Sequence, residues 1–406
     1  MSDTNGFSEV TIEAATKPYG DMTATYSVRF SAAEHVKALD GVRGIAILLV
    51  MVHHMTFIQA AGREYGLIAD AGASGWIGVD VFFVLSSFLI TGILLDSKGT
   101  DGYFSNFWIR RVLRIVPLYY AVLFISFAVL PHVPHPKLAN FGRVAEDEWY
   151  YWLFLSNISI AKANGFRHGI VDVTWSLAIE EQFYLLWPFL IAFLSRRSLV
   201  ITLALLFAGT VLLRIVLITN GVDPIPIYVL TPTHLDPIIV GAAVAILIRS
   251  QFPINGLQIL VWFTMLITSA LLIGLFATRG GLRSEDAVIL IVGFPIIAIF
   301  SGGLILSALI NKATGAMLEN RILRTFGFYS YAMYLFHLPI RAAIRDLLLP
   351  YTRWHDLPIG VLGGQMLFYA ISIAATFVAG WASYHLYEKH FLRLKRFFRT
   401  PPVHSQ

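Results

Sequence analysis

Stretches of mainly apolar residues, most of them near the ~20 residues that cross a bilayer as an α-helix, dominate the pattern along this chain. A further apolar patch, Trp149 to Ile160, is too short to cross straight, so it predicts an interfacial or re-entrant segment. The pattern predicts an all-α, polytopic transmembrane helical bundle of about ten spans, at residues 43–60, 76–96, 112–131, 174–195, 199–219, 236–249, 258–277, 285–310, 326–348 and 361–387.

The basic residues between these spans predict the orientation of the bundle. With a cytoplasmic N-terminus, every cluster of Lys and Arg falls on the cytoplasmic side, as membrane proteins prefer. Counting 149–160 as a crossing would move the later clusters outside. We therefore expect both termini in the cytoplasm, from the clusters Lys98 with Arg110, Arg111 and Arg114, then Arg196 with Arg197, Arg249, Lys312 with Arg321 and Arg324, and Arg393 to Arg399.

The composition supports this interpretation and narrows the chemistry. Hydrophobic residues make up 57% of the 406 residues and charged residues 14%, and the mean hydropathy is +0.69, which excludes a soluble domain. The net charge of +5 follows the span ends and indicates orientation, not nucleic-acid binding. The absence of cysteine excludes disulfides, thiolate metal sites and an acyl-cysteine intermediate.

Three regions follow from the distribution of polar residues. Residues 1–36 are polar and predict a disordered cytoplasmic tail. Residues 37–392 form the membrane domain, and residues 393–406 form a basic cytoplasmic tail. The chain shows no internal repeat.

The first span carries an arginine and two histidines into a segment made for lipid, where such residues are expensive and usually functional. Arg43 and His54 are eleven residues apart, so on a helix they lie within roughly 20° of one face. His53 lies on a different face. The alternative for a lone histidine is a core residue bonded to a backbone carbonyl.

The second span brings Asp80 inward from the outer end, with Ser86 deeper. An intramembrane carboxylate needs a partner, and Asp80 and His54 are expected at similar depths on antiparallel helices. We therefore expect Asp80 to bind one imidazole nitrogen of His54 and to leave the other as a base or nucleophile. The alternative is that Asp80 caps the start of its helix.

Two further spans carry candidate substrate contacts. Arg110, Arg111 and Arg114 place guanidinium groups on one helical face, a pattern that suits phosphates, although a positive-inside anchor would look the same. In the span that opens TWSLAIEEQFYLLWP, Ser176 and Glu180 are four residues apart and share a face. Trp175, Glu181 and, in a later span, His337 are the other candidates for substrate contact.

Five blocks in the same order carry a family resemblance over roughly residues 37 to 392: LDGVRGIA with the histidine eleven residues after the arginine, GWIGVDVFFVLSSFLI, FWIRRVLRIVPLYY, TWSLAIEEQFYLLWP and SYAMYLFH. The chain resembles the acyltransferase 3 family of integral membrane acyltransferases, which includes bacterial O-antigen and exopolysaccharide O-acetylases. Two positions depart from the family pattern: Ser87 replaces a glycine, and His390 replaces a proline.

The resemblance implies a bacterial inner-membrane enzyme that moves an acyl group, commonly acetyl from cytoplasmic acyl-CoA, to a hydroxyl of a carbohydrate or lipid-linked glycan. It implies that His54 is catalytic and pairs with Arg43, and that Arg111 and Arg114 contact CoA phosphates. Asp80 and Glu180 match acidic family positions. No metal is expected.

Two other classes of protein fit the intramembrane polar residues. A transporter or flippase would use Arg43, Asp80 and Glu180 as a polar pathway. A haem or metal protein would use histidines such as His53, His54, His337 or His385, but adjacent histidines on a regular helix cannot face one metal.

Overall fold

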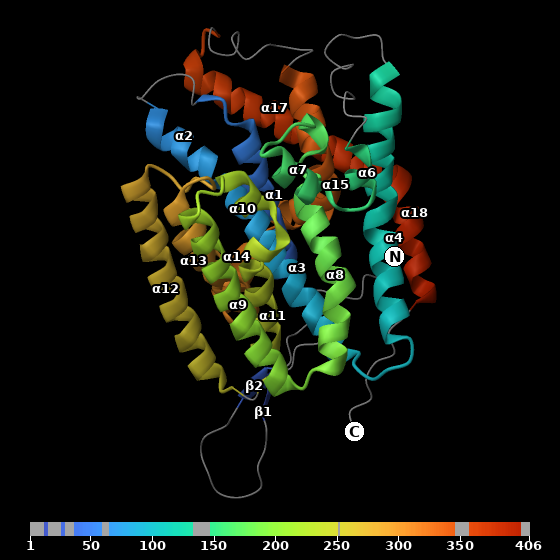
Figure 1. Cartoon of the computed structure of the whole chain (residues 1–406), viewed down its shortest axis with the longest axis vertical. Helices are drawn as coiled ribbons and strands as arrows, with labels where there is room; N and C mark the ends of the chain where they lie inside the picture. The colour runs from blue at the N-terminus through green and yellow to red at the C-terminus, as the bar shows by residue number, and fades with distance from the viewer. Residues whose placement is uncertain are drawn as a thin grey trace, which may run out of the picture.

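The computed structural model is almost entirely helical, and it describes residues 12–14, 26–28, 36–58, 65–132, 147–250, 252–345 and 357–398. The long helices are α1 (Lys37–Met55), α3 (Ile77–Asp96), α4 (Tyr103–Phe124), α8 (Thr174–Phe193), α9 (Arg196–Thr219), α11 (Asp236–Ile248), α12 (Ile254–Arg279), α13 (Phe294–Ile310), α15 (Arg321–Ala343) and α17 (Gly360–Ser383). Figure 1 shows many of them running along the long axis of the molecule.

Shorter elements join or extend these helices: α2 (Gly66–Ala73), η3 (Ser74–Trp76), η4 (Ile125–Val129), η5 (Leu130–His132), α6 (Glu148–Trp152), α7 (Ser156–Ala163), η7 (Gly169–Val171), α10 (Pro224–Val229), η8 (Thr231–Thr233), η9 (Ile289–Gly293), α14 (Lys312–Leu318), η11 (Tyr384–Glu388), α18 (Lys389–Arg393) and η12 (Leu394–Phe397). Strands β1 (Ile12–Ala14) and β2 (Tyr26–Val28) pair antiparallel. The rest of the predicted N-terminal tail lies outside the described residues, as does the end of the predicted basic tail, residues 399–406.

Helix α1 packs closely against α15 because glycines line their contact. A Cβ atom built on Gly44 would overlap the carbonyl oxygen of Leu323, and one built on Gly327 would overlap that of Asp40. Small residues of this kind let the backbones of membrane helices approach. On another side of α1, Gly78 of α3 meets the carbonyl oxygen of Ala46. These contacts fix the rotation of α1, and with it the direction of Arg43 and His54.

The surface of the bundle matches a lipid environment. Large apolar side chains on α12 are among the most exposed in the structure, including Trp262 at 70% and Ile273 at 69%. Exposed apolar residues also follow α9 and α17. In water such continuous patches would be unusual for a monomer, whereas in a bilayer they contact acyl chains. The predicted class, an all-α polytopic membrane bundle, is confirmed.

Each predicted span coincides with a long helix, although the boundaries differ. Among the described residues, seven helical segments are long and apolar enough to cross a membrane. Helices α8 and α15 have the length but carry many polar residues, and α11 has only 13 residues. The count of ten therefore holds for the helices, while three of them depart from the ordinary composition or length of a span.

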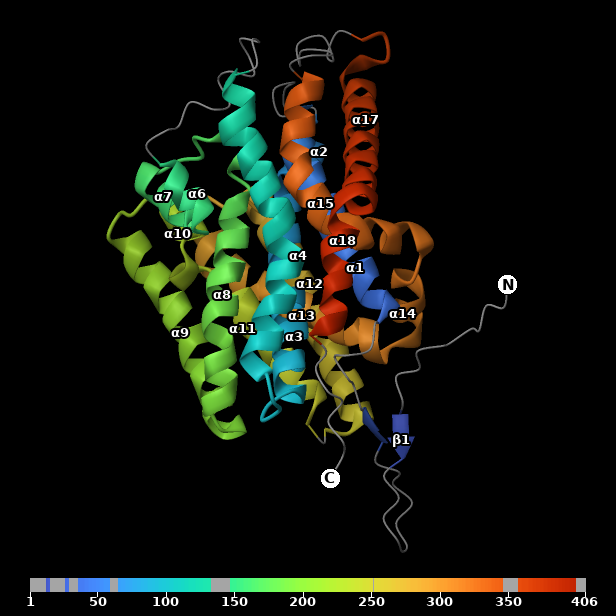
Figure 2. The same cartoon turned by 90° about the vertical axis from the view of Figure 1, so that its right-hand side faces the viewer.

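Residues 149–160 form the short helices α6 and α7, with five and eight residues, and neither could cross a bilayer. Figure 1 places both in the half of the molecule away from β1 and β2, and Figure 2 shows them beside α10. Asp172 stabilises the connection from α7 to α8. Its carboxylate accepts hydrogen bonds from the Tyr151 hydroxyl (3.0 Å) and from the backbone N–H groups of His168 (2.9 Å) and Gly169 (2.8 Å).

Candidate active site

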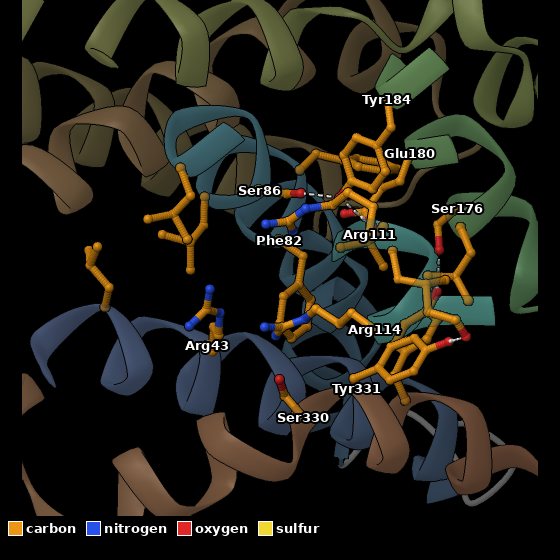
Figure 3. Close-up of a pocket in the computed structure, with 18 of the residues that line it drawn as sticks. Arg43, Phe82, Ser86, Arg111, Arg114, Ser176, Glu180, Tyr184, Ser330 and Tyr331 are labelled. Atoms are coloured by element: carbon orange, nitrogen blue, oxygen red, sulfur yellow. Dashed lines mark hydrogen bonds between the residues drawn. The ribbon is translucent and has the colours of Figure 1, made fainter. Parts of the chain in front are cut away.

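A cavity of about 380 Å³ lies among residues of α1, α3, α4, α8 and α15. It collects most of the polar residues that the sequence singled out, and Figure 3 shows their side chains around one space. The polar residues that line it are Arg43, Ser86, Arg110, Arg111, Arg114, Ser176, Glu180, Tyr184, Ser330, Tyr331 and Tyr334. Helices far apart in the sequence therefore bring the predicted arginines, serines and one glutamate to a single cavity.

The four arginines give this cavity an excess of positive charge. Arg43 is paired with Asp40 at 2.9 Å, whereas in the described part of the chain no carboxylate lies within ion-pair distance of the other three. The Nε atom of Arg111 is buried without a hydrogen-bond partner. Guanidinium groups bind phosphates through two parallel hydrogen bonds, so the lining suits an anionic ligand with phosphate groups.

The position of these arginines depends on where α4 begins. The sequence predicted a span from residue 112, but the helix starts at Tyr103, so Arg110, Arg111 and Arg114 lie inside it, in its third and fourth turns. The side chain of Arg111 turns toward α8, where its guanidinium carbon lies 6.0 Å from the centre of the Tyr184 ring. Figure 3 shows Arg111, Glu180 and Tyr184 close together on one wall of the cavity.

Glu180 lies in a hydrogen-bonded group with two hydroxyls. The Tyr184 hydroxyl is 3.1 Å from Glu180 Oε2, and it also contacts the hydroxyl of Ser86 on α3. Glu180 and Tyr184 are four residues apart, so they share one face of α8. The hydroxyl of Ser87 instead reaches the carbonyl oxygen of Ile238, away from the cavity. The departure from glycine at Ser87 therefore leaves the space beside Ser86 open.

Tyr334 connects the cavity with the predicted catalytic histidine. Its hydroxyl lies 2.6 Å from the Ser176 hydroxyl and 3.1 Å from the Val173 carbonyl oxygen, and its own carbonyl oxygen lies 2.6 Å from Nδ1 of His337. Nε2 of His337 is 3.2 Å from Nδ1 of His54. His54 is partly exposed but does not line the cavity, and a chain of contacts leads from Tyr334 in the cavity wall through His337 to His54.

The predicted contact between Asp80 and His54 is wrong. Asp80 Oδ1 lies 2.7 Å from Nε2 of His234, in the connection before α11, and His54 pairs with His337 instead. The alternative, in which Asp80 caps its helix, is wrong too, because α3 has no side-chain cap. Gly75 lies against His53 and Gly78 lies against Ala46, so Asp80 is placed further toward the N-terminus of α1 than His54, and the two residues are not opposite each other.

Two candidates for substrate contact lie behind the cavity wall. Trp175 packs against His234, with ring centres 5.6 Å apart, and does not line the cavity. Glu181 is also absent from the lining, and its Oε1 atom is buried without a hydrogen-bond partner. His53 donates to the carbonyl oxygen of Ala73 at 2.7 Å, on a face of α1 different from that of Arg43, as predicted.

The sequence analysis missed a buried charge cluster beside Asp80. Arg214 of α9 and Asp236 of α11 form a double hydrogen bond with both distances 3.0 Å, and neither side chain is exposed. A signal was available: both lie in apolar stretches, where an ionised residue requires a partner. Tyr334 was also missed, since tyrosine is ordinary in such helices.

Among the described residues, no group of three or more His, Asp or Glu side chains is arranged to hold a metal ion. The histidines suggested for a haem or metal site do not converge: His385 contacts Trp381 and lies on η11, whereas His54 and His337 face each other from α1 and α15. The part of the chain that the structure describes therefore gives no support to the metal-protein alternative.

Comparison with known proteins assigns a family to this arrangement. The model of the acyltransferase 3 family, described as an acyltransferase domain, matches residues 36–385. No solved structure matches the chain.

Relatives of known name are bacterial acetyltransferases. The putative peptidoglycan O-acetyltransferase YrhL of Bacillus subtilis is 28% identical over 370 residues, 87% of this chain and 54% of the relative. The peptidoglycan O-acetyltransferase OatA of Listeria monocytogenes is 31% identical over 76% of this chain and 49% of the relative. The O-acetyltransferase OatA of Staphylococcus aureus is 30% identical over 80% and 53%. The chain thus spans about half the length of these relatives.

Proposed function

This chain belongs to the acyltransferase 3 family, and from that premise we propose that it is a membrane-bound O-acyltransferase. It moves an acyl group, in the simplest case acetyl, from a cytoplasmic acyl-CoA to a hydroxyl of a cell-envelope carbohydrate. The observation that carries the proposal is the cavity with four arginines beside a histidine pair. The names of two relatives, YrhL and the OatA of Listeria monocytogenes, contain 'peptidoglycan O-acetyltransferase', which favours a peptidoglycan sugar as the acceptor.

The donor binds first at the arginines. Phosphate groups of acyl-CoA pair with Arg110, Arg111 and Arg114, which lack a carboxylate partner among the described residues. Arg43, held by Asp40, completes this positive lining. We place this end of the cavity at the cytoplasmic face, where acyl-CoA is found, because Arg110 also donates to the carbonyl oxygen of Phe398 near the basic C-terminal segment.

The acyl group then has to reach His54. We propose that the thioester extends past Tyr334 toward Nε2 of His54, which either accepts the acyl group or removes the proton of the acceptor hydroxyl. The acceptor approaches His54, which is partly exposed and does not line the cavity. Glu180, with Ser86 and Tyr184, lines the donor cavity and orients the donor by hydrogen bonds.

A transporter is not favoured by the geometry. Such a protein would need Asp80 and Glu180 along one polar path. Asp80 is 1% exposed and is occupied by His234, while Glu180 lines the cavity on another helix.

The direct test is a transfer assay with purified protein in liposomes. Radiolabelled acetyl-CoA is supplied with soluble peptidoglycan fragments, and both thiol release and label in the glycan are followed for wild type, His54→Ala and His385→Ala. We expect transfer in wild type and His385→Ala and none in His54→Ala. Full transfer by a folded His54→Ala variant, or no thiol release by wild type with acetyl-CoA and longer acyl-CoAs, would overturn the proposal.

A further inference from the structure

The imidazole of His337 lies within hydrogen-bond distance of the imidazole of His54. The role that we infer for His337 rests on the function proposed above. Nδ1 of His54 lies 3.0 Å from the carbonyl oxygen of Val50 and 3.2 Å from Nε2 of His337, and the two ring centres are 4.8 Å apart. Nδ1 of His337 lies 2.6 Å from the carbonyl oxygen of Tyr334. His337 is fully buried, whereas His54 is partly exposed.

These contacts determine where the ring protons sit. A backbone carbonyl oxygen only accepts hydrogen bonds, so Nδ1 of His337 carries a proton, and in the neutral ring Nε2 is then an acceptor. By the same reasoning Nδ1 of His54 carries a proton, because it faces the carbonyl oxygen of Val50. That proton is shared between the Val50 oxygen and Nε2 of His337.

The opposite arrangement is disfavoured. If Nε2 of His337 donated to His54, both nitrogens of His337 would carry protons and the ring would be positively charged. Its side chain is 0% exposed, and within the described ranges no carboxylate is bonded to it. A buried charge without a partner costs several kcal/mol. In addition, Nδ1 of His54 would present a lone pair to the Val50 oxygen.

We propose that His337 is the positioning residue of His54. It holds His54 in the tautomer with the proton on Nδ1, so that Nε2 is free for the reaction, and it receives the Nδ1 proton when Nε2 becomes acylated. His337 therefore does the work that a carboxylate does in a hydrolase triad, but it is uncharged at rest. A neutral partner suits a site at lipid depth, because it adds no buried charge before the reaction begins.

Atoms and charges balance through the acyl transfer. Nε2 of His54 forms a bond to the thioester carbonyl carbon, the C–S bond breaks, and its electron pair leaves with the CoA thiolate. The acylated ring is positively charged until its Nδ1 proton moves to Nε2 of His337. When the acceptor hydroxyl attacks the acyl carbon, the N–C bond breaks and His337 returns the proton to Nδ1. The hydroxyl proton neutralises the thiolate through the solvent.

Two substitutions separate the two tasks of His337. His337→Gln places an amide oxygen near the former Nε2, which accepts the hydrogen bond from His54 but takes no proton. His337→Phe keeps a ring and offers no acceptor. His385→Phe is the matched control, since Nδ1 of His385 also bonds to a carbonyl oxygen of its own helical stretch, at 2.9 Å from Trp381, and it faces no histidine at hydrogen-bond distance among the described residues.

The first readout is steady-state kinetics per folded molecule. For His337→Phe we expect kcat to fall about 1,000-fold with KM for acyl-CoA within twofold, and for His337→Gln a smaller loss of about 100-fold. His385→Phe is expected to match wild type. A raised KM at unchanged kcat would make His337 a ligand-binding residue and overturn the proposal, as would wild-type kcat in both variants.

The second readout needs no turnover and so separates this inference from the proposed function. Nitrogen-15 NMR of labelled histidine in detergent, assigned with His54→Gln, reports which ring nitrogen of His54 is protonated. We expect the proton on Nδ1 in wild type and His337→Gln and a mixture of tautomers in His337→Phe. A proton on Nε2 of His54 in wild type would overturn the inference even if acyl transfer is observed. This measurement on the wild-type protein remains decisive if His337→Phe does not fold.

Discussion

Among the described residues, His234 and His54 each pair with another side chain inside the helical bundle, and the two pairs differ in access and in partner. His234 has the stronger partner: its Nε2 lies 2.7 Å from Asp80, and Nδ1 lies 2.7 Å from the carbonyl oxygen of Tyr228. The side chain of His234 is 0% exposed and that of Asp80 is 2% exposed. His54 has the imidazole of His337 as its hydrogen-bonding side-chain partner among the described residues, and it is partly exposed.

From this comparison we infer that a carboxylate hydrogen-bonded to a histidine does not by itself make that histidine catalytic. Nδ1 of His234 faces a carbonyl oxygen and carries one proton. A second proton lies between Nε2 of His234 and the carboxylate of Asp80, so this pair has no net charge. With the ion pair of Arg214 and Asp236 beside it, the whole cluster is neutral. It joins α3, α9 and α11, and aromatic rings surround it, so we assign it to stability and assign the reaction to the pair of His54 and His337, in which His54 is partly exposed.

The largest effect is expected from breaking the buried charge cluster of Asp80, His234, Arg214 and Asp236. Arg214→Met leaves Asp236 buried without its partner, which costs about 3–5 kcal/mol. We expect a much lower yield of folded protein and a clear drop of the unfolding midpoint in detergent. The activity per folded molecule should stay near that of wild type, since the cluster does not line the cavity.

The matched variant removes both charges. Arg214→Met combined with Asp236→Leu restores most of the lost stability, because no uncompensated charge remains. If Arg214→Met alone unfolds at the wild-type temperature, the cluster does not have the structural role assigned to it.

A smaller effect is expected from separating α1 and α15, which carry His54 and His337. Gly327→Ala adds a Cβ atom that overlaps the carbonyl oxygen of Asp40, so the two helices must move apart. Overpacking of this kind costs about 1–3 kcal/mol. We expect the transfer rate per folded molecule to fall at least about tenfold, because the hydrogen bond between the two rings lengthens.

Gly209→Ala on α9 is the control for that substitution. No heavy atom lies within 4 Å of the added Cβ at this position, apart from its own helix and chain neighbours. Alanine is a better helix former than glycine by about 1 kcal/mol, so stability should be unchanged or slightly higher. Equal losses in Gly327→Ala and Gly209→Ala would rule out the close approach of α1 and α15 as the cause.

Substitution of an arginine that lines the cavity should weaken the binding of acyl-CoA and leave the rate of the chemical step unchanged. Arg111→Gln removes one charged donor from the proposed phosphate site, and we expect KM for acyl-CoA to rise about tenfold, or about 1.4 kcal/mol, with kcat within twofold. Arg197→Gln, an exposed arginine at the start of α9 that does not line the cavity, serves as the control. Unchanged KM in Arg111→Gln would leave Arg111 as a membrane anchor.

The sequence predicted the helices because hydrophobic length and the charges at the span ends mark them. It also placed Arg111 with Arg114, and Ser176 with Glu180, on shared helix faces, but it did not predict that these residues and Arg43 line one cavity. The partner of His54 could not be derived in the same way. Two residues on neighbouring helices meet only if the offset and the rotation of the helices bring them together, and both are set by glycine contacts such as those of Gly44 and Gly78.

The buried charge cluster also shows which contacts a sequence pattern can predict and which it cannot. Asp80, Arg214 and Asp236 each required a partner, and pairing the unmatched intramembrane charges would have suggested Arg214 with one of the two aspartates. His234 gave no such signal, since it lies in a short connection between α10 and α11. Its role depends on packing against Trp175, Tyr228 and Phe83, which no local pattern encodes.

The most direct test of the central claim compares Asp80→Asn with His54→Gln in the same transfer assay. Asparagine at position 80 can donate to Nε2 of a neutral His234 and keep the cluster uncharged with one fewer proton. We predict that kcat of Asp80→Asn stays within about threefold of wild type, while His54→Gln loses at least about 1,000-fold. If Asp80→Asn loses as much as His54→Gln while its unfolding midpoint stays at the wild-type value, then Asp80 belongs to the reacting pair, and the assignment of its cluster to stability alone is wrong.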